Sequence, residues 1–123
     1  MTKIALRKLA IARSGDKGSS ANIGLIARSP EAYQILCKHV TAERVQDYFR
    51  PLGPSRTRRF ELPKLEALNF LMDGVLAGGG SLSLRLDSQG KALGQALLEL
   101  CLDLSEEELR TTGVKEDDRV DTH

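Results

Sequence analysis

The stretch of this sequence best suited to chemistry is Arg13-Ser14-Gly15-Asp16-Lys17-Gly18, which lies between two apolar segments. Such a density of charge is costly unless solvent or a ligand meets it. A turn over 15–18 could form a nest of backbone amides in which Arg13 and Lys17 bind a phosphate or carboxylate, with Asp16 and Lys17 as candidates for proton transfer. The GxxxxGK[ST] spacing of a P-loop is absent. Local chemistry alone favours a surface hairpin turn in which Asp16 pairs with Lys17 or Arg13.

Two asparagines and a glycine run are the other candidate binding residues. Asn22 and Asn69 each place an amide inside an otherwise apolar pattern, and a buried amide needs a hydrogen-bond partner. Asn69 could bond to the backbone of a turn at Gly78-Gly79-Gly80, which would be a purely structural role. Those three glycines could instead let a ligand touch the main chain, so we keep all five residues as candidates for ligand or partner binding.

The remaining charged and metal-binding residue types predict less. The only basic cluster is Arg56, Arg58 and Arg59, with Phe60 as the lone interleaved aromatic residue, and this indicates a solvated strand rather than a nucleic-acid surface. The chain has two histidines and two cysteines without a recognisable metal-ligand spacing. We therefore expect no metal, no cofactor and no nucleic-acid partner.

Apolar periodicity predicts the elements that must position these residues. We expect a strand over 3–12 with a bulge near Arg7-Lys8, because the parity of its apolar positions changes there. Further strands are predicted over 21–27, 56–62 and 82–86, and helices over 30–39, 41–52 and 92–100. The segment 65–76 has helical spacing, although 67–72 could also be extended. Ser105 and Glu108 have the spacing of a capping box for a short final helix.

This order of elements predicts an α+β fold, a two-layer sandwich of about four strands with helices on one face. We expect one small domain over 1–104, followed by a short helix and a polar tail over 105–123. The length of 123 residues suffices for one hydrophobic core. Aromatic residues make up only 4% of the chain, so aliphatic side chains must fill that core.

Charge and cysteine usage limit the possible environments. The formal net charge of +1 gives no basis for nonspecific attraction to nucleic acid or anionic lipid. No apolar run approaches the roughly 20 residues that a membrane helix needs. With no secretory leader and no CxxC spacing for Cys37 and Cys101, we expect a cytoplasmic protein with reduced thiols and no membrane partner.

Six segments together resemble the C-terminal domain of the acyclic terpene utilisation (AtuA-like) family. In this chain they are Ala12–Gly18, Ala21–Gly24, Phe60–Pro63, Ala67–Phe70, Gly78–Gly80 and Leu84–Asp87. Each is weak alone, but their order and spacing match from about Ile4 to Leu100. The resemblance implies a ferredoxin-like fold, although the predicted strand order is not a plain βαββαβ.

The resemblance also implies a partner domain and a metabolic context. In the family the small domain usually follows a larger N-terminal domain, and such genes tend to accompany acyl-CoA carboxylase and other acyl-CoA catabolic enzymes. Here the small domain stands alone, so the first hypothesis is an accessory domain that binds a larger AtuA-like domain on a separate chain. Its contact surface would be the charged stretch and the Gly78–Gly80 turn.

Two alternatives remain open. The chain could form part of an enzyme site in which Arg13 and Lys17 hold an acyl-CoA, a carboxylate or another anionic small molecule while Asp16 transfers a proton. It could also be a homo-oligomeric scaffold joined through sheet edges.

Overall fold

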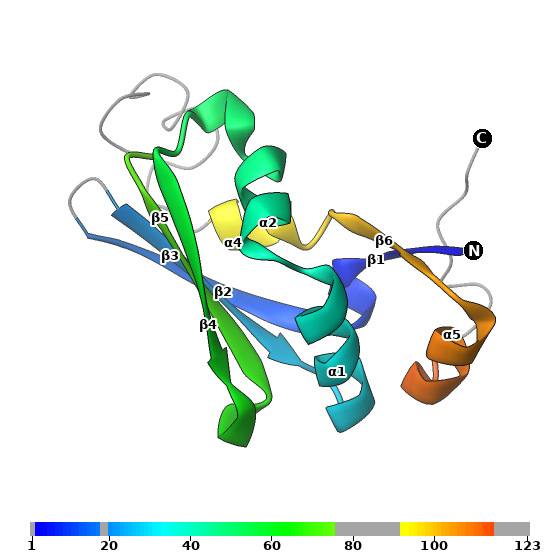
Figure 1. The fold of residues 1–123 in the computed structure, drawn as a ribbon. Helices are drawn as coiled ribbons and strands as arrows, with labels where there is room; N and C mark the ends of the chain where they lie inside the picture. Colours follow the sequence, from blue (N-terminus) through cyan, green and yellow to red (C-terminus); the bar gives the residue numbers. More distant parts are fainter. Residues whose placement is uncertain (1, 18–19, 76–91, 115–123) are drawn as a thin grey trace.

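The structure is a computed structural model that describes residues 2–17, 20–75 and 92–114 (Figure 1). Its strands are β1 (Thr2–Ala5), β2 (Ala10–Lys17), β3 (Ser20–Ala27), β4 (Arg56–Leu62), β5 (Ala67–Asp73) and β6 (Cys101–Leu104). Its α-helices are α1 (Pro30–His39), α2 (Ala42–Tyr48), α4 (Ala92–Leu97) and α5 (Glu106–Thr112). Short 3-10 turns lie at η1 (Leu6–Lys8), η2 (Arg50–Leu52) and η3 (Pro63–Leu65).

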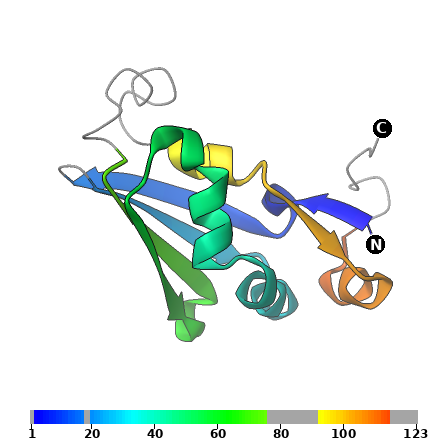
Figure 2. The same cartoon turned by 45° about the horizontal axis from the view of Figure 1, so that its top comes forward.

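The main sheet is antiparallel, with the strand order β2-β3-β5-β4. Helix α1 contacts β3 and β5, α2 contacts β4, and α4 contacts β2 and β3. All three helices lie on the same side of the sheet (Figure 2). The predicted two-layer α+β sandwich is therefore confirmed, and no described helix covers the second face of the sheet.

The connections around this sheet explain why the element order is not a plain βαββαβ. From β3 to α4 the described chain runs strand, helices, strand, strand, helix, and β5 lies between β3 and β4, as in a split βαβ unit. The fourth strand of the sheet is β2, which precedes this unit in the chain. The arrangement is ferredoxin-like, with the last strand supplied from the N-terminal side.

The predicted single strand over 3–12 is wrong, because the chain turns through η1 at the point where the apolar parity changes. Before the turn, β1 pairs with β6 in a separate two-stranded sheet; after it, β2 joins the main sheet. Leu6, the first residue of η1, and Leu9, the residue after it, are both buried. A 3-10 turn, rather than a bulge, therefore accounts for the change of parity.

The segment with helical spacing after Leu65 contains the strand β5, in which Leu68, Phe70 and Met72 are buried on alternate positions. The extended alternative for 67–72 is therefore confirmed and the helical one is wrong. The helix predicted over 92–100 ends at Leu97, and the strand β6 follows it unpredicted. The strand expected over 82–86 and the turn at Gly78–Gly80 lie outside the described residues.

Three of the described helices begin at a capping side chain. The Ser29 hydroxyl accepts a hydrogen bond from the Ala32 amide at 3.0 Å, and the Thr41 hydroxyl accepts one from the Arg44 amide at 3.1 Å. Ser105 begins α5 with the predicted capping box. Helix α2 is shorter than predicted, because the chain passes into η2 before Pro51.

Candidate functional site

The charged stretch is strand rather than loop. β2 extends to Lys17, and its register sets Arg13 opposite Gly24 and Gly15 opposite Asn22. An extended backbone cannot adopt the curled conformation of an anion-binding nest, so the predicted nest is wrong for residues 15–17. The tip of the hairpin at Gly18 lies outside the described residues, as do the side chains of Asp16 and Lys17. Their predicted roles in binding or proton transfer remain predictions.

Strand alternation divides the main sheet into a helix-covered face and a second face, which we call the open face. The described side chains and glycines of the open face are Ile11, Arg13, Gly15, Ser20, Asn22, Gly24, Ile26, Arg56, Arg58, Phe60, Leu62, Ala67, Asn69, Leu71 and Asp73. The ladder register aligns them in rows across the strands. One row contains Arg13, Gly24, Asn69 and Phe60, and the next contains Gly15, Asn22, Leu71 and Arg58.

The two candidate asparagines meet on the open face. The Asn22 amide nitrogen Nδ2 donates to Asn69 Oδ1 at 3.0 Å, and Asn22 is exposed while Asn69 is half-buried. Gly15 stands directly opposite Asn22, and a Cβ built at Gly15 would lie 3.1 Å from Asn22 Oδ1. The absence of a side chain at Gly15 therefore leaves room for this orientation of the amide pair.

Ser14 lies on the other face, against α4. The Gly94 amide donates to the Ser14 hydroxyl at 3.2 Å, and a Cβ at Gly94 would lie 3.0 Å from that oxygen. This contact packs α4 closely on β2. The predicted binding residue Ser14 therefore contributes to helix packing and not to the open face.

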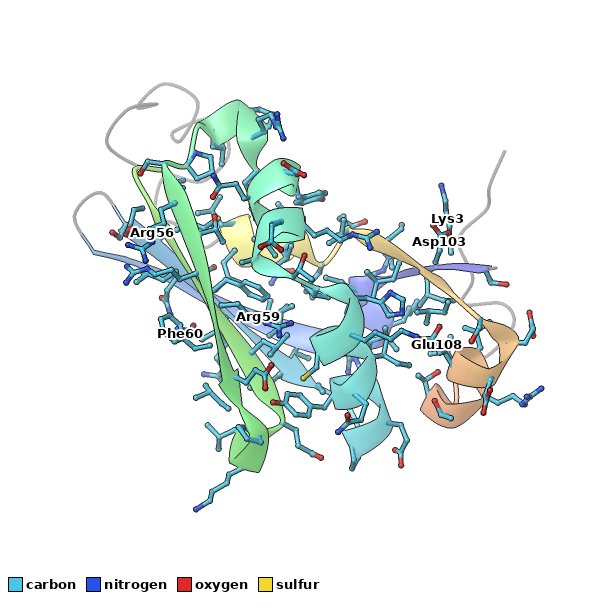
Figure 3. The ribbon with its side chains drawn as sticks, in the orientation of Figure 1. Lys3, Arg56, Arg59, Phe60, Asp103 and Glu108 are labelled. Atoms are coloured by element: carbon cyan, nitrogen blue, oxygen red, sulfur yellow. The ribbon has the colours of Figure 1, made fainter. Side chains whose placement is uncertain are left out.

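The polar end of the open face carries an ion pair. Arg58 Nη2 lies 3.3 Å from Asp73 Oδ2, and Asp73 Oδ1 accepts a hydrogen bond of 2.9 Å from the Ser20 hydroxyl. Arg56 stands opposite Asp73 and is exposed. Arg56 and Phe60 both project on the side of the sheet away from α1 (Figure 3).

The third arginine of the basic cluster, Arg59, binds the end of a helix and is not part of the open face. Arg59 lies on the helix-covered face, where its Nη1 donates to the carbonyl oxygens of Cys37 at 2.8 Å and Val40 at 3.0 Å. These carbonyls belong to the C-terminal end of α1, where backbone acceptors lack helical partners. Arg56 and Arg58 therefore lie on the open face and Arg59 on the helix-covered face, where its hydrogen bonds hold α1 against β4.

The other end of the open face is apolar and exposed. Ile11 is 41% exposed, Phe60 45% and Leu62 40%, and Leu65 in the adjoining turn η3 is 68% exposed. A shallow hollow of about 370 Å³ is lined by Glu61–Leu65. We identified 56–62 from the sequence as a solvated strand but did not single out Phe60 or Leu62 as part of an exposed apolar patch. The signal was present: both faces of β4 carry an arginine, so neither was a plain core face.

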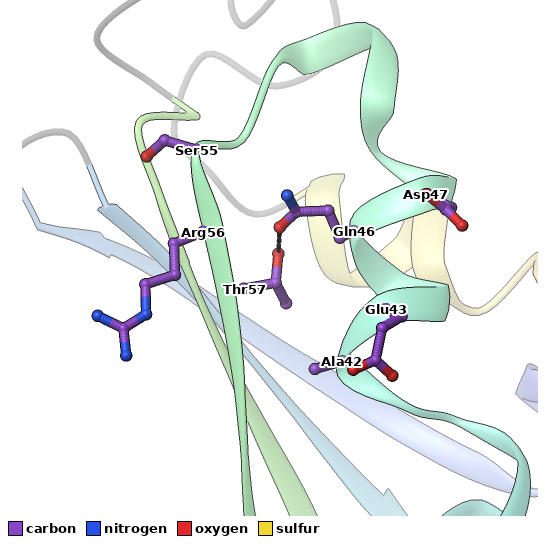
Figure 4. A pocket seen from close by; sticks show the side chains of 7 residues that line it. All are labelled: Ala42, Glu43, Gln46, Asp47, Ser55, Arg56 and Thr57. Carbon is purple, nitrogen blue, oxygen red and sulfur yellow. Dashed lines mark hydrogen bonds between the residues drawn. The ribbon is translucent and has the colours of Figure 1, made fainter.

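A second hollow lies between α2 and the start of β4 (Figure 4). It measures about 350 Å³, and a hydrogen bond from Thr57 to Gln46 crosses it, with Glu43 and Asp47 on the helix side. Arg56 contributes to the lining while its side chain projects to the opposite face (Figure 4). None of the predicted site residues lines this hollow.

Chemically, the described open face is suited to binding. It offers a guanidinium at Arg13, an amide pair and apolar side chains on an exposed surface. Within the described ranges no group of three metal-ligating side chains comes together, and no helix there is long and apolar enough to cross a membrane.

Comparison with known families agrees with the fold. The model of the AtuA ferredoxin-like domain matches residues 4–103, which extend from β1 to β6 and include both sheets. Helix α5 lies beyond the matched region. Comparisons with curated proteins and with solved structures gave no match. Because the family model covers most of the chain, the protein belongs to the AtuA ferredoxin-like domain family, as the sequence motifs predicted.

Proposed function

We propose that this chain is an accessory binding domain that docks through its open face on a larger AtuA-like domain carried by a separate chain. The observation that carries the proposal is the gathering of exposed apolar side chains beside Arg13 and the asparagine pair. The setting we propose is acyl-CoA or terpenoid catabolism in the cytoplasm, where the free thiols of Cys37 and Cys101 would stay reduced.

The apolar end of the open face supports docking. Among the described residues, the large hydrophobic side chains that are exposed are Ile11, Phe60, Leu62 and Leu65, and all four lie on the open face or in the turn at its end. Contiguous apolar surface rimmed by polar residues is typical of protein interaction sites. Because Ile11, Phe60 and Leu62 are already more than half covered in the free chain, a partner that covers the rest would contribute about 1 kcal/mol for each.

Charge favours a different protein over a second copy of this chain. The described strand residues of the open face include the arginines Arg13, Arg56 and Arg58 but only one acid, Asp73. Two such faces brought together would place like charges against each other, which disfavours that pairing. A partner surface with carboxylates around an apolar centre would complement it.

The test is co-expression with the larger AtuA-like chain, followed by size-exclusion chromatography and calorimetry. The wild-type chain should form a complex, and Arg13→Glu should weaken it by about tenfold or more. Arg110→Glu is the matched control, because Arg110 is an exposed arginine of α5, away from the open face. It should bind as the wild type does.

Three outcomes would contradict the proposal. One is the absence of any complex with the larger chain. Another is a stable homo-oligomer that Arg13→Glu dissociates, which would support the scaffold alternative. The third is a thermal shift with acyl-CoA esters in the absence of any complex, which would support the enzyme alternative.

A further inference from the structure

We infer that the missing side chain of Gly24 leaves a space on the open face, which we call the notch, and that a stretch of the partner's main chain packs into it. Hydrogen bonds to the carboxamides of Asn22 and Asn69 hold this stretch in place. This inference rests on the proposed function, since it names the chemistry by which the open face recognises its partner. The recognised group is the main-chain N–H and C=O of one residue in an exposed, extended segment of the partner protein.

The first support is that packing gives no reason for a glycine at position 24. A Cβ built at Gly24 meets only the Arg13 carbonyl oxygen, at 3.9 Å, which is ordinary van der Waals contact. Gly24 also has no positive φ that would exclude another residue. Glycine weakens a strand interior, because it loses more backbone entropy on folding and packs no side chain. Close approach of another molecule would explain its presence.

The second support is the hydrogen-bonding capacity of the amide pair. A carboxamide has two N–H donors and one oxygen with two lone pairs. The bond from Asn22 Nδ2 to Asn69 Oδ1 orients both groups and leaves Asn22 Oδ1 as an acceptor and Asn69 Nδ2 as a donor. In an extended segment the N–H and C=O of one residue point to the same side, so that residue needs one acceptor and one donor, and the amide pair offers both.

The third support is the position of the notch among its neighbours. Gly24 lies between Arg13 and Asn69 in the register, and Phe60 stands on the far side of Asn69. Leu71 lies opposite Asn22. Apolar side chains beside the amides would exclude water once the partner binds, which strengthens the hydrogen bonds there. Arg13 at the rim can meet a carboxylate or carbonyl of the same segment.

The experiment compares folding with binding for Gly24→Ala and Gly24→Val, using urea unfolding and calorimetry against the larger AtuA-like chain. Both variants should be at least as stable as the wild type, because the Cβ position is open and valine favours strands. Binding should fall about tenfold for Gly24→Ala and further for Gly24→Val. Lys3→Val, at an exposed strand position outside the main sheet, is the control and should leave binding unchanged.

A second variant tests the amide pair separately. Gly15→Ala places a methyl group 3.1 Å from Asn22 Oδ1, so it should displace this amide and weaken binding while Gly24 stays intact. If the wild-type complex forms and Gly24→Val binds equally well, the notch is wrong while docking stands. A loss of stability in Gly24→Ala as large as its loss of binding would show a structural glycine and overturn the inference. If the wild-type chain forms no complex, docking itself is wrong and the notch with it.

Discussion

The side chain of Glu108 connects the end of α1 to the start of α5, and its replacement tests how much this connection contributes to stability. Its Oε1 accepts a hydrogen bond from the Ser105 amide at 2.9 Å, completing the capping box. Its Oε2 lies 2.8 Å from His39 Nε2 and 3.4 Å from Lys38 Nζ. Glu108→Gln keeps a capping-box residue but removes the charge, whereas Glu108→Ala removes both.

The stability that Glu108→Gln should lose follows from the pKa of Glu108. The backbone hydrogen bond from Ser105 is the largest cause, followed by His39 and Lys38, and together they lower the pKa of Glu108 from 4.5 to about 2 against the opposing effect of burial. A shift of this size corresponds to at most about 3 kcal/mol of stability. The carboxylate lies near the surface, where solvent screens the charge, so we expect about 1–2 kcal/mol for Glu108→Gln. Glu108→Ala should cost about 1 kcal/mol more, because the cap is lost too.

The pH dependence has a definite sign. Because the pKa of Glu108 is lower in the folded state than its ordinary value, the stabilisation is complete above about pH 4.5 and disappears as the pH falls towards about 2. Urea unfolding followed by circular dichroism measures the free energy of unfolding of the wild type and Glu108→Gln across this range. The difference between them should narrow steadily below pH 4.5. A difference that stays constant from neutral pH to about pH 2 would refute this account of Glu108.

Three other substitutions test separate contacts by urea unfolding. Arg59→Met should lower the free energy of unfolding by about 2–3 kcal/mol, because the carbonyls of Cys37 and Val40 lose a charged donor. Arg59→Lys should recover part of this loss. Equal stability of the wild type and both variants would contradict the role of Arg59. Glu66→Gly should raise the free energy of unfolding by about 0.5–1 kcal/mol, because Glu66 has a φ of 52°, in the left-handed region that glycine adopts more easily. A less stable variant would count against this. Tyr33→Phe should change the free energy of unfolding by less than about 1 kcal/mol, because the buried Tyr33 hydroxyl has only the thiol of Cys37, a weak hydrogen-bonding group, near it. A larger loss of stability would contradict this.

Local chemistry was sufficient to predict most elements of the fold. Ser29 and Thr41 mark helix starts through their own side chains, and the strand predicted over 56–62 is β4. Such signals lie within a few residues of the element that they predict. The strand β6 has only four residues, and it pairs with β1 at the other end of the chain. No local pattern could predict that pairing.

The candidate site was predicted in part, for a similar reason. The glycines and charges at 13–18 have turn chemistry, and the sequence does not show that the strands of a hairpin extend almost to its tip. Asn22 and Asn69 were both identified as candidates, but their contact depends on the register between β3 and β5, which only the folded sheet defines. The exposure of Phe60 depends on which face of the sheet the helices cover.

The pairing of β1 with β6 has a consequence for synthesis of the protein on the ribosome. The described strands of the main sheet all come from residues 10–73, whereas Thr2 pairs with Leu104. At a translation rate of about 5–20 residues per second, β1 waits on the order of 5–20 s for its partner strand. During that interval Ile4, which is fully buried in the finished domain, lacks the cover of β6. A nascent chain from which β6 has not yet emerged should therefore bind a chaperone through β1, while a chain from which α5 has fully emerged from the ribosome should not.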